Sequence, residues 1–189
     1  MGTGEMIITI GAIILLGNII MTTNRGIGES SQTLLLTSYG IDAISLATSI
    51  IQNAEKLDFD EKTKDSVQIN SPTQLTTYDS LGYDSGTDST VGPDDVDDYN
   101  GPDTGSVTNR YRIEYDTLAT GVYAVKTQVH YVSLASMETY VKTQTYYKRL
   151  DIWVWNKDET NPMTINPKTG IGTPDTLARM ATILSYWVF

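Results

Sequence analysis

The sequence predicts an α+β protein in which a long N-terminal α-helix packs on a small antiparallel β-sheet domain. Three observations support this fold class. Residues 6–21 are almost entirely apolar, residues 36–57 repeat apolar side chains at helical spacing, and four segments after residue 109 resemble strands in composition. We therefore divide the chain into an N-terminal helix at 1–57, an acidic loop region at 58–108 and a β-sheet surface domain at 109–189.

The apolar run extends from Met6 to Met21 and reads MIITIGAIILLGNIIM, with Thr9 and Asn18 as its polar residues. It is somewhat shorter than the roughly 20 residues that a helix needs to cross a bilayer, and flanking Gly and Thr residues could extend it. Nothing basic precedes Arg25, which is unlike the start of a secretory signal peptide. A helix that is apolar all round must be buried all round, either in lipid or among other helices.

The second half of the predicted helix is amphipathic and follows a polar break, TTNRGIGESS. Its apolar positions are Leu36, Tyr39, Ala43, Leu46, Ala47, Ile50, Ala54 and Leu57. If helix runs through the break, residues 5 to 57 form a rod about 80 Å long. Gly17, Asn18, Gly26 and Gly28 are weak helix formers, so we expect an interruption near residues 17–28.

The region from residue 58 to 108 is rich in Asp, Ser, Thr, Gly and Pro, and eight Asp residues lie between Asp79 and Asp103 with no Lys or Arg among them. Oxygen ligands of the type that Ca²⁺ prefers gather in its second part. They are Asp94, Asp95, Asp97, Asp98, Asn100 and Asp103. The spacing fails the EF-hand pattern, because Tyr99 occupies position five of a loop begun at Asp95. Two interpretations stay open: a calcium site, or a solvated acidic loop.

Four segments in the last part of the chain are predicted strands. They are Arg110–Asp116, Tyr123–Val132, Thr145–Trp155 and Ala181–Val188. Larger or apolar side chains alternate with polar ones, as in Val125, Thr127, Val129 and Tyr131, so one face of the sheet could cover the helix. The turn-rich segment Asn156–Asp175 is expected to form a surface excursion before the last strand.

Composition excludes several classes of function. A net charge of −10 and a pI near 4.4 argue against nucleic-acid binding. The absence of cysteine removes disulfides, thiolate metal sites and a cysteine nucleophile. His130 is the single histidine and lies in a predicted strand, where a structural role is commoner than catalysis. We find no enzymatic constellation and expect a non-enzymatic protein, with Ca²⁺ as its one candidate cofactor.

A glutamate at position 5 opens the hydrophobic helix, which continues into an amphipathic half and then a small antiparallel sheet. In this layout the chain resembles mature type IV pilins and pseudopilins, including minor pilins. IDAISLATSIIQNAEKLDFDEKT is similar to the end of their long helix, and DDVDDYNG and YYKRLDIWVW continue the likeness. The family usually begins with an apolar residue that is followed by a Thr and further apolar residues, whereas here Gly2, Thr3 and Gly4 precede Glu5. The chain also lacks the cysteines that close a C-terminal loop in many Gram-negative pilins.

The resemblance implies a structural subunit of an extracellular type IV pilus-like filament at the cell surface, with cell adhesion as a secondary role. It implies a subunit that is held in the inner membrane before assembly and then polymerises through its N-terminal helix with the help of pilus or secretion machinery. Met1 and Glu5 become the assembly residues, because the family pairs this glutamate with the α-amino group of a neighbour. Two alternatives are a membrane-anchored β-domain that binds calcium or another ligand, and a minor pseudopilin of a secretion or pilus machine.

Overall fold

The computed structural model describes residues 2–82, 92–101, 111–157 and 176–187. The chain divides into two compact units, residues 1–39 and residues 40–189. Helix α1, Thr3–Ala54, begins in the first unit and ends in the second. The second unit also holds the β-sheet and a series of short 3-10 helices.

Helix α1 is unbroken over its 52 residues, so the interruption expected near residues 17–28 is wrong. An isolated glycine weakens a helix by only about 1 kcal/mol and keeps its backbone N–H, so it need not end the helix. The Asn18 amide donates to the Ile14 carbonyl at 3.1 Å. The hydroxyls of Thr9, Thr22, Thr23, Thr33 and Thr37 likewise donate to the carbonyl four residues earlier. These bonds satisfy polar side chains within the helix, as an apolar environment requires.

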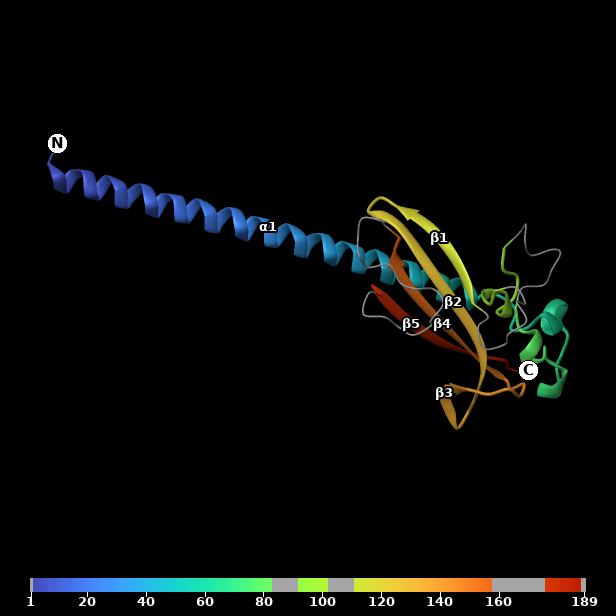
Figure 1. Cartoon of the computed structure of the whole chain (residues 1–189). Coiled ribbons are helices and arrows are strands. Elements are labelled where there is room, and N and C mark those ends of the chain that lie inside the picture. Colours follow the sequence, from blue (N-terminus) through green and yellow to red (C-terminus); the bar gives the residue numbers. More distant parts are fainter. Residues whose placement is uncertain (1, 83–91, 102–110, 158–175, 188–189) are drawn as a thin grey trace. The chain divides into compact units, whose positions relative to one another are not determined.

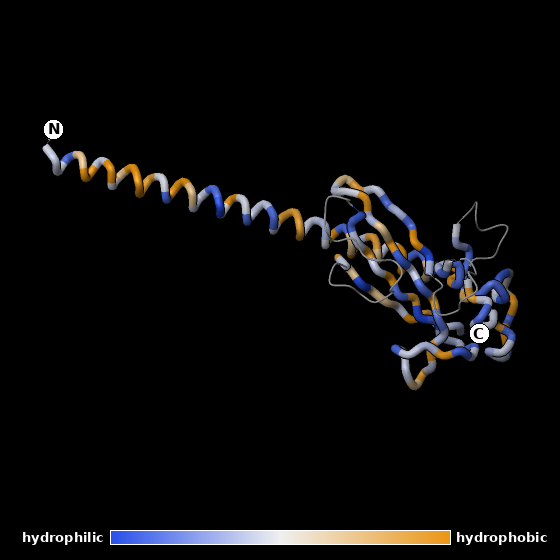
Figure 2. Tube along the Cα trace, viewed as in Figure 1, coloured by the Kyte–Doolittle hydropathy of each residue, from blue (hydrophilic) through white to orange (hydrophobic). Residues whose placement is uncertain are grey.

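Large apolar side chains surround α1 in the first unit. Residues 2–37 are exposed throughout, and Ile7, Ile8 and Met21 have 71%, 73% and 74% of their surface accessible. Figure 2 shows this hydrophobic stretch along the N-terminal half of the helix. By length and composition alone, α1 could cross a membrane.

The second unit is built on an antiparallel sheet with strand order β1-β2-β4-β5, and β3 pairs with the end of β2 (Figure 1). The strands are β1 Arg112–Leu118, β2 Gly121–Ser133, β3 Ser136–Tyr140, β4 Tyr147–Asn156 and β5 Ala178–Ser185. All four predicted strands are confirmed, with ends displaced by one to three residues. β3 was not predicted, because SMETY has no apolar alternation. The expected excursion at Asn156–Asp175 lies almost entirely outside the described residues.

The end of α1 packs on this sheet, which confirms the α+β prediction. Ala43, Ala47 and Ala54 are buried, and their small side chains let the helix backbone approach the strands. The Thr48 hydroxyl lies 3.9 Å from the sulfur of Met180 on β5. These alanines belong to the predicted apolar stripe, so the amphipathic pattern placed this face of the helix correctly.

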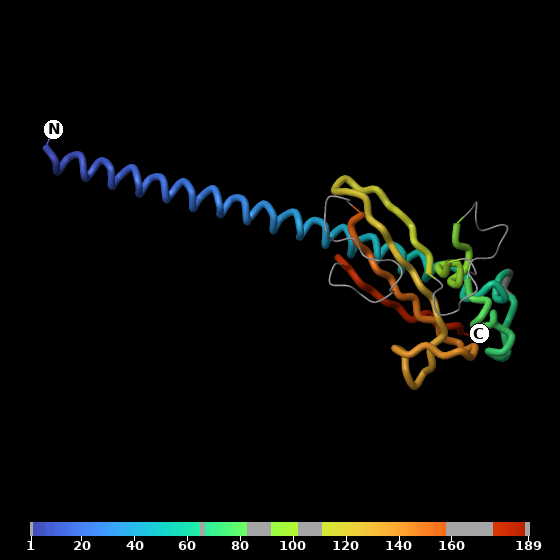
Figure 3. The backbone as a smooth tube through the Cα atoms, viewed as in Figure 1, coloured from blue at the N-terminus to red at the C-terminus, as the bar shows by residue number. Residues whose placement is uncertain are grey.

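The 3-10 helices cover one end of the sheet, near the end of β5 (Figure 3). They are η1 Glu61–Ser66, η2 Pro72–Gln74, η3 Tyr78–Ser80 and η4 Asp97–Tyr99. A buried cluster of Phe59, Ile69, Leu75, Tyr78, Leu81 and Tyr131 fixes the first three to β2. The Tyr186 hydroxyl accepts a hydrogen bond from the Ile69 N–H at 3.0 Å. This end of the sheet positions the charged groups described next.

Candidate functional site

Glu5, one of the two predicted assembly residues, lies in the first turn of α1. Its carboxylate accepts a hydrogen bond from the Gly2 N–H at 3.2 Å. A negative charge is favourable there because the free N–H groups give the start of a helix partial positive charge. Met1, the other assembly residue, lies outside the described residues.

The acidic segment is buried from Asp95 to Asn100, whereas Asp94 is exposed. Asp95, Asp97 and Asp98 have only 2%, 2% and 3% of their surface exposed, and Asn100 is equally enclosed. The solvated-loop interpretation is therefore wrong for residues 95–100. A short parallel bridge joins Asp95 to Asp58, with the Val96 N–H donating to the Asp58 carbonyl at 3.0 Å. Asp103 lies outside the described residues.

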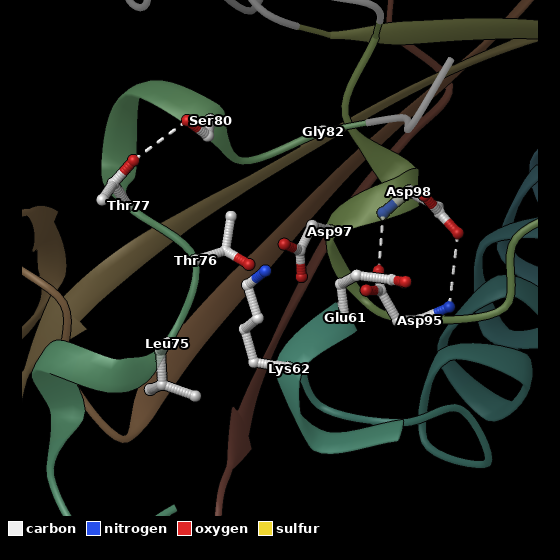
Figure 4. A pocket seen from close by; sticks show the side chains of 10 residues that line it. All are labelled: Glu61, Lys62, Leu75, Thr76, Thr77, Ser80, Gly82, Asp95, Asp97 and Asp98. Carbon is white, nitrogen blue, oxygen red and sulfur yellow. Dashed lines mark hydrogen bonds between the residues drawn. The ribbon is translucent and has the colours of Figure 1, made fainter. Parts of the chain in front are cut away.

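Two of these carboxylates hold the turn itself. The Asp98 carboxylate accepts hydrogen bonds from the N–H groups of Asp94 and Asp95, at 2.9 and 3.3 Å. The Asp98 N–H in turn donates to Asp95 Oδ1 at 3.2 Å (Figure 4). This reciprocal arrangement shapes the backbone before η4 in the way that acidic caps shape helix starts.

Asn100 joins the segment to the central strand β2. Its side-chain amide donates to the Val129 carbonyl at 2.8 Å and accepts from the Val129 N–H at 2.7 Å, so it acts as a one-residue strand partner. The Thr127 hydroxyl donates to the Tyr99 carbonyl at 2.7 Å. Gly101 is required next to this contact, because a Cβ there would lie 2.1 Å from the Tyr111 carbonyl oxygen.

Lys148 on β4 is the centre of the site and is completely buried. Its ammonium donates to the Phe59 carbonyl at 2.7 Å, to Asp60 Oδ2 at 2.9 Å and to Asp97 Oδ1. The rings of Phe59 and Tyr131 lie 4.6 and 5.4 Å from Nζ. Three acceptors thus match the three donors of the ammonium. Burial acts to lower the pKa of Lys148, but the charges of Asp97 and Asp60 outweigh it and raise this pKa.

Asp60 is fully buried and is surrounded by hydrogen-bond donors of the protein. It accepts hydrogen bonds from the Thr76 N–H and hydroxyl, the Lys62 N–H and the Tyr131 hydroxyl, besides Lys148. Burial acts to raise the pKa of Asp60. The charge and hydrogen bond of Lys148, together with hydrogen bonds from the Lys62 N–H and the Thr76 side chain, outweigh burial and lower this pKa. Asp60 is therefore held as a carboxylate.

The pKa values of Asp97 and Asp95 are raised, whereas that of Asp60 is lowered. Burial raises the pKa of Asp97 to about 6, against the attraction of Lys148. Burial, reinforced by the charge of Asp97, raises the pKa of Asp95 to about 9. Both residues line a cavity of about 290 Å³ together with Glu61, Thr76 and Asp98 (Figure 4).

A second group of carboxylates lies at the edge of this cavity. Oxygens of Glu61, Asp94 and Asp95 lie within 4.8 Å of one another, close enough to share a metal ion. The ammonium of Lys64 contacts Glu61 and lies 2.6 Å from Asp94 Oδ1, so a bound cation would compete with it. Calcium binding stays a prediction.

The predicted metal ligands thus separate into different roles. Asp97 pairs with Lys148, Asp98 holds a turn, Asn100 binds β2, and Asp94 and Asp95 approach Glu61. Sequence reasoning missed Asp60, Glu61, Lys64 and Lys148. No signal in β4 singles out Lys148, because the same strand also carries Arg149 and Asp151.

His130 lies on β2 beside a second charged group. Its Nε2 is 3.7 Å from Asp151 Oδ2, and Arg149 binds the same carboxylate through two hydrogen bonds of 3.0 and 2.9 Å. Burial lowers the pKa of His130 in spite of the Asp151 charge. A neutral imidazole packed beside an Arg–Asp pair fits the structural role expected for this histidine.

Comparison with protein-family models, with curated proteins and with solved structures finds no match to this chain. A functional assignment must therefore be argued from α1 and from the charged cluster.

Proposed function

We propose that this chain is a structural subunit of a type IV pilus-like filament, held in the inner membrane before assembly and polymerised through its N-terminal helix. The observation that carries the proposal is α1 in the first unit, a continuous helix whose large apolar side chains are exposed around its whole circumference. A surface of this kind is unstable in water and needs apolar surroundings on all sides.

Lipid and a bundle of identical helices both supply such surroundings, so the same segment can serve before and after assembly. The threonine and asparagine hydrogen bonds within α1 support both states, because they leave few polar groups of the helix to be desolvated. Copies that contact one another head to tail through different surfaces form an open helical filament where the rotation between neighbours does not close a ring.

Glu5 is the proposed register device. Burying a carboxylate in an apolar filament core without a partner is unfavourable in free energy. The axial stagger that brings the Glu5 carboxylate next to a cationic group of a neighbour is therefore the most stable one. In the family that this chain resembles, that group is the neighbour's α-amino terminus.

Replacement of Glu5 tests the proposal. Glu5→Ala is expected to reduce incorporation of the chain into surface filaments at least about tenfold. Without the carboxylate, the free-energy difference between aligned and misaligned subunits falls by more than about 1.4 kcal/mol, which corresponds to a factor of ten. Glu29→Ala is the matched control, since Glu29 is exposed in the same helix and pairs locally with Arg25. Incorporation is measured by quantitative immunoblotting of sheared filaments against the whole-cell amount. Equal incorporation of the two variants would contradict the register role of Glu5.

A further inference from the structure

The cluster around Lys148 combines the groups that a self-formed amide cross-link requires. It holds an amine, a carboxyl group in contact with that amine, and a second carboxylate that contacts the same nitrogen. Lys148 and Asp60 are fully buried, and the side chain of Asp97 is 3% exposed. Two aromatic rings enclose the nitrogen.

We propose that Lys148 Nζ and the side-chain carboxyl carbon of Asp97 form an intramolecular isopeptide bond, with Asp60 as the base and acid that moves the protons. The bond would join β4 to η4, two elements that are distant in sequence. It is independent of filament assembly and applies equally to a membrane-anchored domain.

The atoms balance without another reactant. The ammonium of Lys148 gives one proton to the Asp97 carboxylate, which leaves a neutral amine and a neutral acid. The nitrogen lone pair attacks Asp97 Cγ, a C–N bond forms, and the C=O electron pair moves to oxygen. Asp60 Oδ2, 2.9 Å from Nζ, takes a proton from the new N–H₂ group and gives it to the hydroxyl that leaves. The C=O bond re-forms, and one water is released.

The surroundings distinguish the roles of the two carboxylates. Hydrogen bonds from Thr76, Lys62 and Tyr131 keep Asp60 ionised, as a base must be. Asp97 contacts the ammonium of Lys148 directly, so it can take the proton that the ammonium gives up, and the protonated carboxyl is the better electrophile. Asp97 also lines the cavity, which gives the released water a route away from the bond.

Two physical effects favour the reaction. Fixing the nitrogen and the carboxyl group in contact makes the step unimolecular, and such arrangements reach effective concentrations on the order of 10⁵ M or more. Converting a buried ammonium and a buried carboxylate into one neutral amide also removes the cost of keeping both charges away from water. The amide N–H can still donate to Asp60, so the base does not lose its partner.

Mass spectrometry of the full-length chain, purified in detergent and then denatured, tests the proposal. The expected mass is that of the sequence less one water molecule. Trypsin is expected not to cut after Lys148, and the digest should contain peptide 65–110 joined to peptide 143–149. A full-mass chain after prolonged incubation would overturn the proposal. So would a water loss located inside one linear peptide, which indicates a cyclised aspartate.

Variants separate the cross-link from a static ion cluster. Lys148→Arg and Asp60→Asn should both restore the full mass, the first by removing the amine and the second by removing the base. Lys126→Arg is the matched control, since Lys126 is also buried in the sheet, with its ammonium over the rings of Tyr111 and Trp153. It should retain the water loss. Retention of the joined peptides in Lys148→Arg would refute the assignment of the nitrogen, and their retention in Asp60→Asn would refute the role of the base.

Discussion

Replacing Lys148 by Met is expected to destabilise the second unit strongly. The methionine side chain fills a similar volume, so the change removes the charge without leaving a large cavity. It leaves the Phe59 carbonyl, Asp60 and Asp97 without the donor that now binds all three. In the chain in which Lys148 and Asp97 are not yet joined, removing one partner of this buried ion pair costs about 3–5 kcal/mol, because the remaining charge stays buried without compensation. In the joined chain, Lys148→Met also removes the cross-link, so the cost is at least as large.

The free energy of unfolding can be measured by urea titration of the full chain in detergent, with tryptophan fluorescence as the signal. Trp153 and Trp155 lie on β4 and report on the sheet. Lys126→Met is the control: it loses the ring contacts of a buried ammonium and should cost about 1–2 kcal/mol. Adding Asp60→Asn and Asp97→Asn to Lys148→Met should recover part of the loss. A cost for Lys148→Met no greater than that for Lys126→Met would refute the assignment of Lys148 as the electrostatic centre.

Two further predictions concern the acidic segment. Asn100→Ala should cost about 2–4 kcal/mol in a urea titration, because it removes two hydrogen bonds and leaves the buried N–H and carbonyl of Val129 unpaired. Asn53→Ala, at an exposed position of α1, should change little, and equal effects would contradict the strand-partner role. Asp95→Asn should raise the melting temperature at about pH 8 and lose this advantage near pH 4. The pKa of Asp95 is raised to about 9 in the folded protein, above the value of 3.8 in the unfolded chain. The contribution of the protonated Asp95 to the free energy of unfolding is therefore fully present below pH 3.8 and is lost as the pH rises through 9. A difference in melting temperature between the two chains that does not change with pH would contradict the raised pKa of Asp95.

The sequence was sufficient for the main elements of the fold. Hydrophobic spacing located the face of α1 that carries Ala43, Ala47 and Ala54, because a helical stripe is a local property of the chain. Alternation located all four predicted strands for the same reason. Composition was misleading at Gly17 and Gly26, since helix propensity is a small energy and neighbouring residues override it. Among the described elements, β3 was missed because pairing with β2, rather than its own residues, makes it a strand.

The candidate site was much less predictable. A run of aspartates indicates solvent exposure, unless a buried cation compensates for them, and here the cation is Lys148, 51 residues beyond Asp97. Asp60 reaches the same nitrogen from a separation of 88 residues. No local spacing rule connects three positions that only the folded sheet brings together. Glu5, by contrast, was selected from its place before an apolar helix; the structure places it in the first turn of α1, and its assembly role stays a prediction.

The central claim is that this chain builds filaments, and electron microscopy of sheared cell-surface material tests it most directly. We expect uniform thin filaments that bind antibodies against the chain, and in which mass spectrometry identifies the chain as a constituent. Material free of such filaments, with the chain recovered only as a monomer from detergent-solubilised membranes, would contradict the account and favour a membrane-anchored binding domain.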